Sequence, residues 1–75
     1  MNSENIVKLI DLLEEISINA TRYGYASARI KRCNYGSKSF IEYEKEMAEA
    51  SLAVVRARVE IKNMFNENQS KEKGV

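Results

Sequence analysis

Apolar side chains recur at alternating intervals of three and four residues along the first part of the chain. Eight positions follow this rule, and all except Ser27 are apolar. They are Ile6, Leu9, Leu13, Ile16, Ala20, Tyr23, Ser27 and Ile30. Such spacing places side chains along one face of an α-helix. The pattern therefore predicts a helix over residues 4–32, with Gly24 tolerated inside it.

A second run with the same spacing begins at Phe40. Its positions are Phe40, Tyr43, Met47, Ala50, Val54, Ala57, Ile61 and Met64. Ser39 and Glu42 have the three-residue spacing of a capping box, which marks the start of a helix. We therefore expect a second helix over residues 40–65. Residues 66–75 are polar and charged apart from the last two, and we expect them to form a flexible tail.

The segment 33–38 connects the two predicted helices. It contains Asn34 and Gly36, which suit a helix C-terminus followed by a short turn. Because two helices joined by so short a connection pack antiparallel, we expect an all-α antiparallel two-helix hairpin that forms one domain over residues 1–65. Folding the chain at this turn pairs Ala20 with Ala50. At that layer the helices would approach closely, or a third element would fill the gap.

The second predicted helix carries another apolar stripe outside its first run. The stripe consists of Ile41, Ala48, Leu52, Val55 and Val59, and a row of small residues on the first helix could receive it: Ser17, Thr21, Gly24 and Ala28. A two-helix monomer would leave the stripe in water, and a chain of 75 residues buries little surface alone. We expect a homo-oligomer, a dimer or higher, built as a helical bundle. The alternative is that these are scattered surface residues.

This expected architecture resembles that of the Rop family, plasmid RNA-binding helical hairpins that dimerise into four-helix bundles. The resemblance covers the two helices and their turn. It implies a bundle of hairpins as the assembly, and no sequence motif carries a function with it.

The residue types of the chain disfavour an enzyme. Histidine is absent and Cys33 is the only cysteine, so the usual pairs of nucleophile and base cannot form. Glu42, Glu46 and Glu49 share one helical face, but di-iron bundles also need a Glu-x-x-His motif. We interpret these glutamates as a solvated surface and expect no metal and no cofactor. We expect Cys33 to be a reduced, structural thiol.

The apolar segments are short and interrupted. The start of the chain lacks a basic, apolar leader, and the longest uninterrupted apolar stretch is residues 52–55. A helix that spans a membrane needs about 20 apolar residues. We therefore expect a cytoplasmic protein without a membrane segment.

Charge is segregated along the chain although the net charge is only +1. Residues 1–15 contain four acidic residues and one lysine, a net charge of −3, whereas residues 16–41 contain five cations and no acid, a net charge of +5. Within the basic segment, Arg22, Tyr25, Arg29 and Arg32 are three, four and three residues apart. This spacing predicts one stripe on the outer side of the first helix.

The stripe and the turn together form a candidate ligand site. Its residues are Arg22, Tyr25, Arg29, Lys31, Arg32, Tyr35 and Lys38. Guanidinium groups bind phosphate oxygens and tyrosine rings stack on bases, so we expect a small non-enzymatic accessory protein that holds or sequesters a nucleotide or nucleic acid. The same residue types also form protein hot spots, so docking of an acidic protein surface is the alternative. Pairing with acidic residues of a neighbouring subunit, or plain solvation, also remains open.

Overall fold

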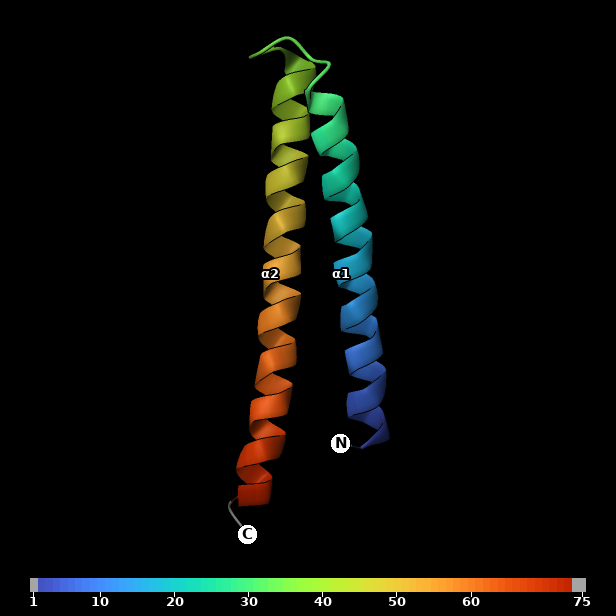
Figure 1. The fold of residues 1–75 in the computed structure, drawn as a ribbon, viewed down its shortest axis with the longest axis vertical. Coiled ribbons are helices and arrows are strands. Elements are labelled where there is room, and N and C mark those ends of the chain that lie inside the picture. The colour runs from blue at the N-terminus through green and yellow to red at the C-terminus, as the bar shows by residue number, and fades with distance from the viewer. Residues whose placement is uncertain (1, 74–75) are drawn as a thin grey trace.

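The structure is a computed structural model that describes the backbone of residues 2–73 and the side chains of residues 2–67. It consists of two long helices, α1 (Ser3–Ile30) and α2 (Lys38–Lys73). The helices run antiparallel beside each other and are joined by a short turn (Figure 1). The expected all-α hairpin is therefore confirmed. Neither helix, over the residues described, has the length and hydropathy needed to cross a membrane.

Local hydrogen bonds fix the helix ends. The side chain of Asn2 accepts a hydrogen bond of 2.9 Å from the backbone N–H of Asn5 and so caps the start of α1. At the start of α2, Oγ of Ser37 accepts a hydrogen bond of 3.2 Å from the backbone N–H of Phe40. The predicted capping residue, Ser39, is therefore wrong by two positions. The second helix begins at Lys38 because the side chain of Ser37, and not that of Ser39, accepts a hydrogen bond from a free N–H group of the first turn.

The turn depends on Gly36, whose φ is +78°. A side chain on an L-residue is strained in this region, so Gly36→Ala is expected to lower the free energy of unfolding by about 1–2 kcal/mol. Urea unfolding followed by circular dichroism at fixed protein concentration measures this change. Gly36→Asn is the matched control and should lose less, because asparagine tolerates positive φ. Equal stability of the alanine variant and the parent would contradict the prediction.

The second helix ends later than the sequence pattern indicated. The predicted end was residue 65, whereas α2 continues to Lys73. Residues 66–73 contain no proline or glycine and are rich in glutamate, glutamine and lysine, which favour helix even without an apolar face. Flexibility of the predicted tail, residues 66–75, stays a prediction, and its last two residues lie outside the described part of the chain.

The core occupies the half of the hairpin farther from the turn. Leu12, Ala57 and Met64 are buried there, and three half-buried residues pack against them: Leu9, Ile16 and Ile61. Nearer the turn, the buried positions are Ala26 and Ala50, both 0 % exposed. Small side chains allow close approach and large ones keep the helices apart. The helices accordingly diverge from the turn toward the chain ends in Figure 1.

The contact face of α1 differs from the predicted face by a rotation about the helix axis. Leu12, Asn19 and Ala26 are buried, whereas the predicted core positions Leu13 and Ala20 are exposed. At half of the predicted contact positions of α1, the residue that contacts α2 is the one before the predicted residue. One residue corresponds to about 100° around the helix, so the contact face as a whole is rotated by about 50°. The predicted layer of Ala20 against Ala50 is therefore wrong. The predicted face of α2 is confirmed, since every position in its run is buried or half-buried.

Polar contacts along one edge of the hairpin accompany this rotation. Apolar residues cover a broad part of α1, so spacing alone does not decide which edge of that surface meets α2. In the observed orientation, Nζ of Lys8 lies 3.2 Å from Oε1 of Glu60. Fourteen residues further along α1, Nη2 of Arg22 lies 2.7 Å from Oε1 of Glu46. The predicted orientation would turn both cations away from α2.

The second apolar stripe of α2 is uncovered, as predicted for a single chain. Its large members, Ile41, Leu52, Val55 and Val59, are 49–56 % exposed. The oligomer inferred from this stripe stays a prediction.

Candidate functional site

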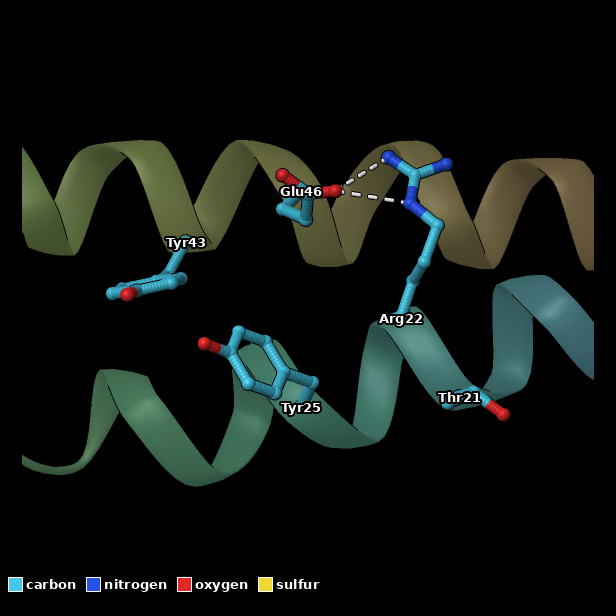
Figure 2. A pocket seen from close by; sticks show the side chains of 5 residues that line it. All are labelled: Thr21, Arg22, Tyr25, Tyr43 and Glu46. Atoms are coloured by element: carbon cyan, nitrogen blue, oxygen red, sulfur yellow. Dashed lines mark hydrogen bonds and ion pairs between the residues drawn. The ribbon is translucent and has the colours of Figure 1, made fainter.

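An open cleft lies between the helices in the half of the hairpin near the turn. Its volume is about 320 Å³, and it is lined by Thr21, Arg22 and Tyr25 of α1 and by Tyr43 and Glu46 of α2. Figure 2 shows the hydroxyl of Tyr25 pointing across the cleft toward Tyr43. The two rings come from different helices and offer apolar surface with polar edges. We call this feature the tyrosine cleft.

Arg22 is fixed by hydrogen bonds at one end of the cleft. Its Nε and Nη2 atoms donate to Oε1 of Glu46 at 2.9 and 2.7 Å (Figure 2). Its Nη1 atom donates to Oδ1 of Asn19 at 2.9 Å, and Nδ2 of Asn19 donates to the backbone carbonyl of Glu15 at 2.8 Å. These bonds satisfy the buried amide of Asn19. They also neutralise the charge of Arg22.

The predicted location of Arg22 is therefore wrong. The sequence pattern placed it on the outer side of the first helix, whereas it is half-buried at the boundary with α2. The glutamate that pairs with it belongs to the same chain. Of the stripe Arg22, Tyr25, Arg29 and Arg32, Arg22 thus pairs with a glutamate in the segment 42–49, and it does so within one hairpin and not across a subunit contact.

The energy of the Arg22 and Glu46 pair is expected to be small. Their side chains are 39 % and 46 % exposed, and Oε2 of Glu49 lies 3.8 Å from Nη2 of Arg22 as a second carboxylate. A double-mutant cycle of Arg22→Ala and Glu46→Ala should give a coupling energy of about 0.5–1 kcal/mol, because water screens exposed pairs. Urea unfolding of the four proteins measures it. A coupling above about 2 kcal/mol would contradict this expectation.

Arg29 extends the cleft toward the turn. Its Cζ atom lies 4.8 Å from the centroid of the Tyr25 ring, a cation–π contact between residues one helical turn apart. Both side chains are exposed. The guanidinium group is thereby held beside the tyrosine that lines the cleft, and no carboxylate of the described residues pairs with it.

The turn itself is basic and aromatic. Arg29, Lys31, Arg32 and Lys38 are exposed and form no ion pair within the described part of the chain. Tyr35 is 92 % exposed, and its ring centroid lies 5.0 Å from that of Phe40. No acidic residue occupies the first turn of α2. We call these five site residues the basic turn: Arg29, Lys31, Arg32, Tyr35 and Lys38.

The predicted site residues thus fall into two adjoining groups. Arg22 and Tyr25 line the tyrosine cleft, and the others form the basic turn. Sequence reasoning missed Tyr43 and Glu46 as lining residues. Glu46 precedes the contact position Met47, and residues that flank a contact face commonly form ion pairs between helices. That signal could have identified Glu46, whereas Tyr43 was assigned only to the contact face.

Two further observations bear on the site. Among the residues described, no group of three or more acidic, cysteine or histidine side chains could hold a metal ion. In comparisons with protein-family models, curated proteins and solved structures, the chain matches none. The functional inference therefore comes from the tyrosine cleft and the basic turn.

Proposed function

We propose that the hairpin is a small binding protein that holds a nucleotide or a single-stranded nucleic acid at its turn end. The basic turn contacts phosphates, and the tyrosine cleft contacts a base. One observation carries this proposal. Four exposed cations at the turn have no carboxylate partner in the described residues, whereas Arg22 is already paired with Glu46.

The chemistry of these groups fits a phosphate with an attached aromatic ring. An arginine that stacks on a tyrosine keeps its N–H groups free at the edge of the guanidinium plane, so Arg29 can donate to phosphate while it contacts Tyr25. Tyrosine rings bind bases by stacking regardless of base identity. A base at Tyr25 would place its phosphate near Arg29 and the turn.

Glu46 orients such a ligand. Its carboxylate occupies the guanidinium group of Arg22, so the Arg22 end of the cleft offers phosphate no free cation, and the basic turn is left as the place for the phosphate. Arg22 then serves as a positioning residue and not as a phosphate ligand. Its contact with Glu46 joins the two sides of the cleft, and its contact with Asn19 fixes the guanidinium group on α1.

Titration of a panel of mononucleotides and short single-stranded oligonucleotides, followed by fluorescence anisotropy and calorimetry, tests the proposal. Arg29→Ala and Arg32→Ala should each weaken binding about tenfold, because each removes a charge-assisted contact worth about 1.5 kcal/mol. Arg56→Ala is the matched control, an exposed arginine outside the site that should leave affinity unchanged. Circular dichroism and sedimentation should show the parent helicity and assembly for all three variants.

Salt dependence separates the phosphate contacts from the stacking contacts. For a single-stranded oligonucleotide, each arginine removed should lower the slope of log affinity against log salt by about 0.7. Tyr25→Ala should instead weaken binding by about five- to hundredfold with little change of slope. If only oligonucleotides bind, the ligand is nucleic acid, and if mononucleotides bind alone, it is a free nucleotide.

A parent protein that binds no member of the panel would refute the proposal. The basic turn would then dock an acidic protein surface, an alternative favoured by the 92 % exposure of Tyr35 beside unpaired cations.

A further inference from the structure

α1 presents a second face that its own hairpin leaves uncovered. Six exposed residues on this face follow a spacing of four and three residues: Ile6, Ile10, Leu13, Ser17, Ala20 and Gly24. The three large side chains among them are 48 %, 49 % and 52 % exposed. A Cβ added to Gly24 would meet nothing within 4 Å. We call this set the α1 stripe.

The α1 stripe is divided by size. Its large residues lie in the first half of the helix and its small residues lie in the second half. Suppose that a second α1 packs antiparallel against the first about a twofold axis at Ser17. A residue that lies a given number of positions before Ser17 then opposes the residue that lies about as many positions after Ser17 in the second copy. Each large residue of the stripe therefore meets a small one. The layers are Ile10 against Gly24 of the second copy, Leu13 against Ala20, and Ile6 against Ser27, a half-buried residue that follows the stripe along α1. Alternation of large and small side chains fills such a contact without voids.

We propose that two copies of the hairpin dimerise through the α1 stripe, packed antiparallel about a twofold axis at Ser17. This contact is isologous, so one surface serves both copies. It goes beyond the proposed ligand binding, since the stripe contains no residue of the basic turn. The cations of the basic turn enter only through the net charge that favours the antiparallel direction.

Charge selects the antiparallel arrangement. Residues 1–15 carry four acids and one lysine, a net charge of −3, and residues 16–41 carry five cations and no acid, a net charge of +5. Antiparallel packing brings the acidic segment of one copy beside the basic segment of the other. Parallel packing would place like charges together and large side chains against large ones.

A hollow beside Ala20 gives the opposing leucine a place to pack. Its volume is about 320 Å³, and its lining residues are Ala20, Tyr23, Ser51, Val54, Val55 and Arg58. Because Leu13 of the second copy faces Ala20, its side chain can enter this hollow. Val55 belongs to the exposed apolar stripe of α2, and it also borders the α1 stripe at this hollow. Tyr23 and Val55 are 43 % and 49 % exposed and would gain cover in the same contact.

With full cover of its apolar side chains, the surface reaches the lower limit of area for a specific dimer. Each of the large, half-exposed side chains on this surface still has on the order of 100 Å² to bury. With the small residues between them, each copy offers roughly 600 Å², so the total reaches the lower bound of about 1,200 Å² for stable protein interfaces.

Cross-linking of single-cysteine variants tests the arrangement. In a Cys33→Ser background, Leu13→Cys and Ala20→Cys proteins are mixed at micromolar concentration and treated with a short bismaleimide. We expect mainly heterodimers of the two variants by mass spectrometry, because residues 13 and 20 oppose each other only in the antiparallel dimer. Ile18→Cys, 61 % exposed outside the stripe, is the control and should not cross-link. Predominant Leu13→Cys homodimers, or cross-linking of Ile18→Cys at the same yield, would overturn the proposal.

Sedimentation equilibrium of charge variants provides an independent readout. Leu13→Asp should raise the dissociation constant of the dimer at least a hundredfold, whereas Ile18→Asp should leave it unchanged. A monomeric parent at about 100 μM would overturn the proposal. Dissociation by Leu52→Asp together with an unaffected Leu13→Asp would assign the contact to the stripe of α2 and would also overturn it.

Discussion

Leu12→Ala is expected to lower the free energy of unfolding by about 2–4 kcal/mol, because it removes a buried side chain and leaves a cavity that the hairpin cannot close. Leu12 is 6 % exposed and packs with Ala57 and Met64. In so small a hairpin this loss is a large share of the total stability, so most molecules should unfold at 37 °C.

Thermal and urea unfolding followed by circular dichroism measure the loss at Leu12. Ile18→Ala is the control on the same helix, because Ile18 is 61 % exposed. It should change stability by no more than about 0.5 kcal/mol, since alanine also has the higher helix propensity. Equal effects of the two substitutions would show that α1 does not meet α2 through Leu12.

Ala50→Leu is the second change with a large expected effect. Ala50 is 0 % exposed in the part of the hairpin where Ala26 is also 0 % exposed, so three added carbon atoms have no free space. The larger side chain must push the helices apart and disturb the adjoining tyrosine cleft. We expect a loss of about 1–3 kcal/mol, the usual range for overpacking.

Ala48→Leu is the matched control for Ala50→Leu, since Ala48 is exposed two residues away on the same helix. It should leave the unfolding midpoint nearly unchanged. A more stable Ala50→Leu protein would mean that the helices near the turn enclose unused space. The equivalent change at Ala20 is not expected to overpack the hairpin, because Ala20 is exposed.

The sequence predicted the elements of this fold better than their mutual orientation. Periodic apolar residues and Gly36 were sufficient to predict the two helices, the turn and the contact face of α2. They were insufficient for α1, because its apolar surface is wider than the contact, and spacing alone does not choose between Leu12 and Leu13. Ion pairs such as that of Lys8 with Glu60 bring together residues far apart in the chain.

In the candidate site, contacts within one helix could likewise be predicted from the sequence, whereas contacts between the helices could not. Tyr25 and Arg29 lie one helical turn apart on α1, so their contact follows from spacing alone. The cleft beside them also needs Tyr43 and Glu46, and their position depends on the rotation of α1 and on its close approach at Ala26 and Ala50. Spacing within one helix does not contain that information.

The carboxylates that face Arg22 have a consequence for the sliding of one helix along the other. Glu42, Glu46 and Glu49 succeed one another at about one helical turn along α2, and Arg22 already lies near the last two. A shift of α1 by one turn, about 5.4 Å, would exchange one carboxylate for the next and keep Arg22 paired. The ion pair therefore resists separation of the helices but does not choose their register. That choice falls to steric contact, because the same shift would drive bulky side chains into the space that Ala26 and Ala50 leave open.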